Sequence, residues 1–265
     1  MIAVTGTGGM LGSAVMRAIN DVPHLAAQGF DREHLDITSR ASIAHAFTAY
    51  TPDVVINCAG LTPHRDPLPM HDEYWAVNAM APLVLARECD AVGARLIHVS
   101  TDCVFSGQRP IEDGPYTEAD TPDATDPYGQ SKAFGEVIGA PHLTVRCSFV
   151  GLGERGLIAA LRRGVVTEGW SQAFWSGSTA PAIARALVEL AQRPEITGLM
   201  HLTRGVVTSK ADLIVRLQDV GLIPSPLGKY RVVDEPHINR WLASNRSDVP
   251  VLPSLHEALR ELANG

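Results

Sequence analysis

Short apolar segments alternate with amphipathic segments along most of the chain. The apolar segments predict strands at residues 2–5, 25–30, 54–57, 95–100, 143–147 and 199–202. Between them, apolar residues recur at helical spacing at residues 10–19, 41–49, 73–92, 128–138 and 180–192. Short apolar strands separated by helices are typical of a parallel sheet covered on both faces. The pattern therefore predicts an α/β fold, a Rossmann-like doubly wound parallel sheet with right-handed crossovers.

The periodicity weakens after Val150. Residues 151–178 and 205–253 contain several prolines and scattered aromatic residues, whereas the segment near residues 180–204 returns to the sheet pattern. We therefore expect residues 1–150, joined by about 179–204, to form the main domain. About 151–178 and 205–265 are expected to form a small second lobe.

Composition limits the kinds of partner. The formal net charge is −7, which argues against a nucleic-acid partner because phosphate binding needs clustered cations. No apolar run approaches the roughly 20 residues of a membrane span, and a strand that starts at Ile2 leaves no place for a signal peptide. Cys58, Cys89, Cys103 and Cys147 show neither zinc-ligand spacing nor the density of a disulfide scaffold. We expect a cytoplasmic protein without a metal site.

A glycine-rich turn follows the first predicted strand. Gly6, Gly9 and Gly12 are spaced G-x-x-G-x-x-G and lead directly into a helix. Glycine lets the backbone approach a pyrophosphate, and the helix N-terminus supplies N–H donors and a favourable dipole. The alternative is a tight strand-to-helix turn without a ligand. The strand–turn–helix context favours a dinucleotide site, which makes residues 1–150 with 179–204 the dinucleotide-binding domain.

Acidic residues follow at the spacing of a ribose ligand. Asp31 lies at the end of the second strand candidate, and a carboxylate there favours NAD because it repels a 2′-phosphate. Arg32 beside it offers a partner for that phosphate, so NADP stays open. Asp36 is a second candidate, for the adenine amino group; its alternative is a helix N-terminal acid before Thr38.

Tyr128 and Lys132 lie four residues apart on a predicted helix and so share one face. With five tyrosines and three lysines in the chain, chance gives roughly 0.06 such pairs. Ser100 and Thr101 end a strand at the carboxyl edge of the sheet, where open α/β sheets bind ligands. A nearby ammonium is expected to lower the tyrosine pKa and improve Tyr128 as a general acid, while Thr101 polarises a carbonyl. The pattern predicts an oxidoreductase.

Several motifs together resemble one family, the extended short-chain dehydrogenase/reductases, and within it the dTDP-4-dehydrorhamnose reductase branch. The similarity covers roughly residues 1–150, continues near 175–205 and is thin beyond. The motifs that carry it are TGTGGMLG from Thr5, NCAG from Asn57, WAVNAMAP from Trp75, STDCVFSG from Ser100, PYTE from Pro115, YGQSK from Tyr128 and VRCSFVG from Val145.

The resemblance implies a role for particular residues. Thr101, Tyr128 and Lys132 match the catalytic threonine, tyrosine and lysine of the family. It also implies a cofactor, NADP(H) or NAD(H), and a homodimer, since the family often pairs helices of this domain. The cofactor-binding residues that we expect are Gly6, Gly9, Met10, Leu11, Gly12, Asp31, Arg32, Asp36, Asn57, Cys58, Ala59, Gly60, Asn78 and Ser100.

The implied activity is reduction of the 4-keto group of a nucleotide-linked 6-deoxyhexose, for surface polysaccharides. Two alternatives remain: an epimerase or dehydratase of the same superfamily, and a non-catalytic nucleotide-binding regulatory subunit. Cys103 stands where the rhamnose-forming enzymes usually carry an aromatic residue, which leaves the particular sugar open. The candidate substrate contacts are Thr62, His64, Arg65, Cys103, Phe174, Trp175, Arg240 and Arg246, each with a packed or solvated alternative.

Overall fold

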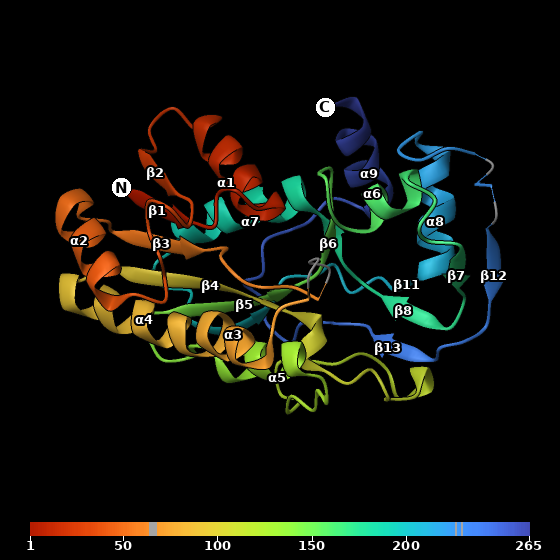
Figure 1. Cartoon of the computed structure of the whole chain (residues 1–265), viewed down its shortest axis with the longest axis horizontal. Coiled ribbons are helices and arrows are strands. Elements are labelled where there is room, and N and C mark those ends of the chain that lie inside the picture. The colour runs from red at the N-terminus through yellow and green to blue at the C-terminus, as the bar shows by residue number, and fades with distance from the viewer. Residues whose placement is uncertain (64–67, 226, 229) are drawn as a thin grey trace.

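The computed structural model describes residues 1–63, 68–225, 227–228 and 230–265. Its centre is a six-stranded parallel sheet with the strand order β10-β5-β4-β3-β1-β2 (Figure 1). The strands are β1 (Ile2–Thr5), β2 (Ala27–Phe30), β3 (Val54–Asn57), β4 (Arg95–Thr101), β5 (Leu143–Cys147) and β10 (Gly198–His201). The order reverses between β1 and β3, and such a switch point is where open α/β sheets bind ligands. The predicted Rossmann-like fold is confirmed.

Helices cover both faces of this sheet. On one face, α1 (Met10–Asn20) and α7 (Ala180–Ala191) pack over Val4, Ile56 and Ile97. On the other face, α2 (Arg40–Tyr50) and α4 (Ala81–Val92) pack over Ala3, Val55 and Leu96. Successive strand residues thus enter opposite cores, which explains why apolar side chains occur on both faces of the strands.

The predicted elements recur with shifted ends. The strand expected at 25–30 begins at Ala27, because Leu25 N–H closes a turn on the Val22 carbonyl. The helix expected at 73–92 is three segments: α3 (His71–Tyr74), a π-helical turn (Trp75–Met80) and α4. The helix expected at 128–138 is α5 (Pro127–Phe134); it ends early because Val137 N–H donates to Thr144 Oγ1 (2.9 Å) on β5.

The remaining segments form the right-hand part of the molecule in Figure 1. Trp175, Leu213 and Leu259 belong to its separate apolar core. Its elements are β6 (Phe149–Val150), α6 (Leu157–Arg162), β7 (Glu168–Trp170), β8 (Ala173–Trp175), β9 (Ser178–Thr179), β11 (Thr208–Ser209), α8 (Lys210–Asp219), β12 (Arg231–Val233), β13 (Ile238–Arg240) and α9 (Leu255–Asn264).

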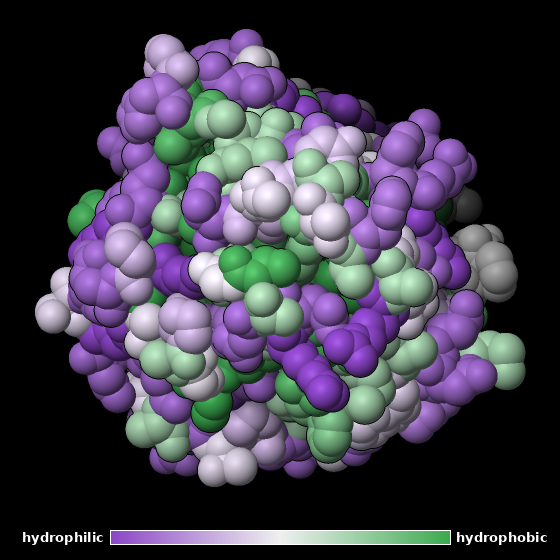
Figure 2. Space-filling model, turned by 90° about the vertical axis from the view of Figure 1, so that its left-hand side faces the viewer, coloured by the Kyte–Doolittle hydropathy of each residue, from purple (hydrophilic) through white to green (hydrophobic). Residues whose placement is uncertain are grey.

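The side of the molecule at the left of Figure 1 faces the viewer in Figure 2, and its surface carries both hydrophilic and hydrophobic residues. Across the described ranges, no helix is both long and apolar enough to cross a membrane. The same ranges hold no group of three or more His, Cys, Asp or Glu side chains that is arranged for a metal ion.

Candidate active site

The glycine-rich turn joins β1 to α1 and leaves no room for a side chain at Gly6 or Gly12. Gly6 has φ +72°, and a Cβ there would lie 2.6 Å from the Ala59 backbone nitrogen. A Cβ on Gly12 would collide with the Gly6 carbonyl oxygen. Gly9 caps α1 without a side-chain hydrogen bond, so the first-turn N–H groups are not used by a capping side chain. These features make the turn a cradle that fits a pyrophosphate.

Met10 and Leu11 lie in the first turn of α1. The Leu11 side chain is buried in the main core, and the Met10 side chain packs against that core beside Gly151. Their side chains therefore point into protein, and the groups that they can offer a pyrophosphate are backbone N–H groups.

The acidic candidates lie after β2. Asp31 Oδ1 accepts hydrogen bonds from the backbone N–H groups of Glu33 (3.0 Å) and His34 (3.1 Å) and contacts His34 Nδ1 at 2.7 Å. The His34 hydrogen bond lowers the pKa of Asp31, which favours the carboxylate. Arg32 is exposed.

Asp36 has a local structural role. Its Oδ1 accepts from the Thr38 backbone N–H (2.9 Å) and hydroxyl (2.7 Å) and so stabilises the turn before α2. The N-cap of α2 is Ser39, so Asp36 is not itself the helix cap.

The loop after β3 is fixed by Asn57, which is fully buried. Asn57 Oδ1 accepts from the Thr5 hydroxyl (2.6 Å) and the Ala59 N–H (3.1 Å). Cys58 and Ala59 are half-buried and Gly60 is exposed. Burial raises the pKa of Cys58 to about 12, which keeps the thiol neutral. The loop thus offers backbone groups beside the glycine-rich turn.

Asn78 lies in the π-helical turn and holds the same loop from the other side. Its Oδ1 accepts from Leu61 N–H (2.8 Å), and its Nδ2 donates to the Leu61 carbonyl (3.0 Å). Nδ2 also donates to the Ser131 hydroxyl (3.3 Å) on α5. Asn78 therefore ties the loop to the helix that carries Tyr128, and its amide is committed to protein. Single π-turns are frequent at functional sites.

The catalytic candidates meet where β4 ends and α5 begins. Thr101 is the last residue of β4, and its Oγ1 accepts from Cys103 N–H (3.1 Å). Tyr128 lies in the first turn of α5, whose N-cap Asp126 accepts from Gly129 N–H (2.9 Å). Lys132 is buried on the next turn, and its Nζ donates to the Val99 carbonyl (2.7 Å). The structure brings the predicted trio together.

The expected lowering of the tyrosine pKa is wrong for this arrangement. Burial raises the pKa of Tyr128, and the Thr101 hydroxyl only opposes that rise. Lys132 is not among the groups that shift the pKa of Tyr128, and its Nζ donates to the Val99 carbonyl. Burial instead lowers the pKa of Lys132 to about 8. Tyr128 is therefore a neutral phenol at pH 7, which is the form that donates a proton.

Two cationic side chains adjoin this trio. Arg240 donates from Nε to the Phe105 carbonyl (3.3 Å), and its guanidinium lies 3.3 Å from Cys103 Sγ. Lys210, the first residue of α8, places its Nζ 4.8 Å from the centre of the Trp175 ring. The positive charge of Arg240 opposes the rise in the pKa of Cys103 that burial causes. Cys103 in turn opposes the lowering of the Lys210 pKa by burial. Sequence reasoning missed Lys210, because it belongs to no motif and the signal is only spatial.

The other candidates lie elsewhere or have their side chains packed or hydrogen-bonded within the protein. Trp175 is 2% exposed and its Nε1 donates to Ser148 Oγ (2.6 Å), so it is a core residue. Phe174 lies on β8, opposite Asn239 on β13, and Thr62 is exposed. Ser100 donates to Glu136 (2.8 Å). His64 and Arg65 lie outside the described residues.

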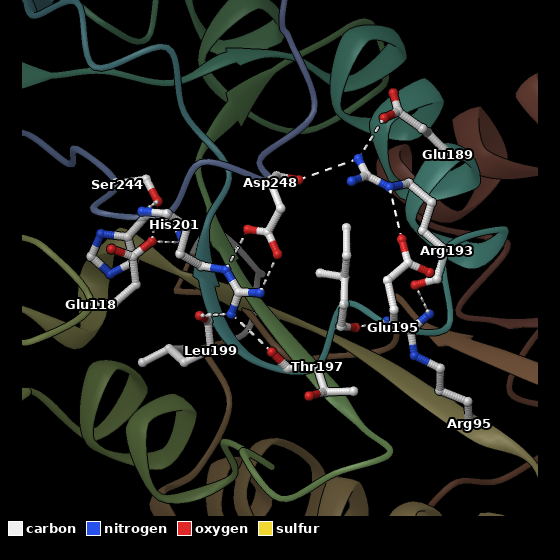
Figure 3. A network of polar contacts seen from close by, with 12 residues as sticks. Arg95, Glu118, Glu189, Arg193, Glu195, Thr197, Leu199, His201, Ser244 and Asp248 are labelled. Atoms are coloured by element: carbon white, nitrogen blue, oxygen red, sulfur yellow. Dashed lines mark hydrogen bonds and ion pairs between the residues drawn. The ribbon is translucent and has the colours of Figure 1, made fainter.

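Arg246 does not reach the site. Its guanidinium donates to both carboxylate oxygens of Asp248 (2.8 and 2.7 Å). It also donates to the carbonyls of Thr197 (2.8 Å) and Leu199 (3.0 Å), which Figure 3 labels together with Asp248. The contacts with Thr197 and Leu199 tie the C-terminal segment to the edge of the sheet, so the expectation of a phosphate contact was wrong in placing Arg246 at the site.

Fold and site define a dinucleotide-binding protein of the short-chain dehydrogenase/reductase type. The family model described as RmlD substrate binding domain matches residues 1–219, and the chain belongs to this family. The resemblance drawn from the motifs is confirmed.

Individual relatives agree with this assignment. The chain is 33% identical over 228 residues to the dTDP-4-dehydrorhamnose reductase of Mycobacterium tuberculosis, covering 79% of this chain and 71% of the relative. It is 36% identical over 166 residues to the probable low-salt glycan biosynthesis reductase Agl14 of Haloferax volcanii, covering 58% of this chain and 54% of the relative. The chain spans about half the length of the first curated relatives it matches.

The solved structures support the fold. The dTDP-4-dehydrorhamnose reductase of Bacillus anthracis, solved in complex with NADP, superposes with a TM-score of 0.81 at 20% identity, covering 98% of this chain and 97% of the other. At that identity the likeness speaks for the fold alone.

Proposed function

We propose that the protein is an NAD(P)H-dependent reductase of the 4-keto group of a nucleotide-linked 6-deoxyhexose, acting in deoxysugar and surface polysaccharide biosynthesis. The observation that carries the proposal is the meeting of Thr101 and Tyr128 at the carboxyl edge of the sheet. The glycine cradle lies at the same edge, after β1. The names of the relatives agree with this activity.

The cofactor would be held by the chain's own backbone. The Gly6–Gly12 turn and the first turn of α1 fit the pyrophosphate, because Gly6 and Gly12 allow the tight backbone packing of the turn and no side chain caps the N–H groups of α1. Asp31 fits the adenosine ribose as a carboxylate. The loop from Asn57 to Gly60 would lie along the cofactor. When bound, the reduced nicotinamide supplies the hydride.

The chain itself supplies the proton and the polarisation. The Thr101 hydroxyl donates to Asp102 Oδ1 (3.1 Å) in this structure and would turn to donate to a substrate carbonyl oxygen, while Tyr128 is a neutral phenol that would protonate the same oxygen as it becomes an alkoxide. Arg240 and Lys210 place two positive charges beside these groups. Positive charges next to Tyr128, the proton donor to the carbonyl, suit a substrate that carries a diphosphate.

The arrangement around this site extends the proposal. Residues 151–178 and 205–265 would be the substrate-binding lobe, since Lys210 and Arg240 come from it. Met80, Phe134 and Ile138 are exposed apolar residues near α4 and α5, which supports a homodimer through those helices. A cytoplasmic location fits a nucleotide-sugar substrate.

The test is oxidation of NADPH and NADH with a panel of nucleotide 4-keto-6-deoxysugars. Tyr128→Phe should abolish turnover and preserve cofactor binding, because only the phenolic proton is removed. Tyr50→Phe is the matched control, since Tyr50 is an exposed residue of α2. Near-normal activity in Tyr128→Phe would refute the proton donor. Cofactor binding without turnover on any sugar would instead favour the epimerase, dehydratase or regulatory alternatives.

A further inference from the structure

A chain of buried polar groups leads from the loop after β3 to Lys132. The Thr5 hydroxyl and the Ala59 N–H both donate to Asn57 Oδ1. Asn57 Nδ2 lies 3.0 Å from His98 Nδ1, and His98 Nε2 lies 3.4 Å from Lys132 Nζ. Asn57 and His98 face each other on the paired strands β3 and β4, and both are fully buried. No water need be invoked to connect these groups.

The contacts determine which nitrogen of His98 carries the proton. A backbone N–H can only donate, so Ala59 fixes the Asn57 oxygen on its own side and turns the amide nitrogen toward His98. His98 Nδ1 must then accept. Burial and the Lys132 charge lower the pKa of His98 well below its usual value, so the ring is neutral. Its single proton is therefore on Nε2, and an N–H faces Lys132.

This orientation distinguishes the two forms of Lys132. A free amine has a lone pair that accepts the Nε2–H, whereas an ammonium has none and presents N–H against N–H. The Val99 carbonyl accepts from either form. The other ionisable groups around Nζ are Glu136, Cys58 and Cys147.

The surrounding charges do not cancel this effect. Burial raises the pKa of Cys58 and Cys147, so both thiols are neutral. The Glu136 carboxylate is shared with Arg146, whose Nε and Nη2 both donate to it at 2.7 Å. The Glu136 charge still raises the pKa of Lys132, but burial outweighs it and the pKa of Lys132 stays lowered.

We infer that His98 is a positioning residue that acts through Lys132: its Nε2–H, oriented by Asn57, favours the free amine over the ammonium. His98 thereby sets how readily Lys132 gives up a proton one helical turn from Tyr128. The catalytic meaning of this effect rests on the proposed function, but the ionisation of Lys132 can be measured without any substrate.

The experiment uses lysine labelled with ¹³C at Cε, because the chain has only three lysines, at positions 132, 210 and 229. The Cε shifts are followed by NMR from pH 6 to pH 11, and Lys132→Met assigns the signal. In the wild type the Lys132 signal should titrate near pH 8, the value to which burial lowers its pKa. His98→Gln places an amide at about the position of Nε2, and its oxygen can turn to Lys132 and accept from the ammonium, so its midpoint should rise.

His98→Asn is one carbon shorter and withdraws the N–H from Lys132. Its midpoint should rise by about one pH unit, a tenfold change in proton affinity. The basic limb of the pH profile of turnover should move with it. A midpoint that rises in neither variant would overturn the inference.

A second measurement does not depend on how the variants fold. The ¹⁵N shifts of His98 in the wild type should show a protonated Nε2 and a bare Nδ1; a protonated Nδ1 would also overturn the inference. If no sugar is reduced while the titrations behave as described, the proposed function fails and the role of His98 in the ionisation of Lys132 stands.

Discussion

Replacing Gly12 by alanine tests whether the turn after β1 is a pyrophosphate cradle. The added Cβ would overlap the Gly6 carbonyl, which is backbone and cannot rotate away. Overpacking of this kind costs about 1–3 kcal/mol, and for a chain of this size each kcal/mol lowers Tm by about 2–4 °C. Opening the turn also misaligns its N–H groups. Each charge-assisted hydrogen bond lost contributes about 1.5–3 kcal/mol, so NADPH affinity should fall by about tenfold to a hundredfold.

Gly8→Ala is the control in the same turn. An added Cβ at Gly8 meets no atom within 4 Å, and Gly8 does not have a positive φ. Its Tm and its NADPH affinity should match those of the wild type. Titration calorimetry and thermal melts of both variants give the two quantities. If Gly12→Ala binds NADPH as well as Gly8→Ala does, the backbone cradle is not where the cofactor binds.

Three further outcomes are expected. Asp31→Ala should relax any preference against NADPH in a comparison of the two cofactors; an unchanged ratio would remove Asp31 from the ribose site. Glu136→Gln leaves the Arg146 guanidinium, 2% exposed, without its carboxylate, so urea unfolding should show a loss of about 3–5 kcal/mol; a loss below 1 kcal/mol would contradict the pairing. The pKa of Lys132 is lowered on folding, so the unfolded chain binds more protons above pH 8 and stability rises with pH from that point. The free energy of unfolding of Lys132→Met minus that of the wild type should therefore shrink by about 3 kcal/mol between pH 7 and pH 10, and a constant difference would argue against a buried, weakly basic amine.

The strands could be predicted because both faces of the sheet are covered. Residues 2–4 and 54–56 are apolar on both faces, whereas in residues 143–147 the buried Thr144 and Arg146 alternate with apolar side chains; the predicted ends of all three strands agree with the structure. The helix at 73–92 was predicted as continuous, since the residue inserted by a π-turn leaves apolar spacing nearly unchanged. The helix after Tyr128 ends early because Thr144 on β5 competes for the backbone of Val137. That competitor lies on the following strand, seven residues further along the chain, and only the fold brings it to Val137.

The second lobe could not be predicted in detail. Its strands have two or three residues, and β8 pairs with β11 and β13 from segments much later in the chain. Such short strands carry no periodicity that a sequence reveals. Trp175 was open between a pocket wall and a core role for the same reason: only the fold shows that its ring is covered and its Nε1 donates to Ser148.

The difference between a motif and a site is clearest at Lys132. Its spacing from Tyr128 indicates a shared helix face, and from that alone an ammonium acting on a phenol is the natural expectation. The fold adds groups that no local pattern contains: the Val99 carbonyl takes one N–H, and His98 presents another N–H to the same nitrogen. Both come from β4, so the strand that ends in Thr101 also determines the proton affinity of Lys132. A motif identifies Tyr128 and Lys132 as candidates for proton transfer, but their protonation depends on the neighbouring groups that the sheet provides.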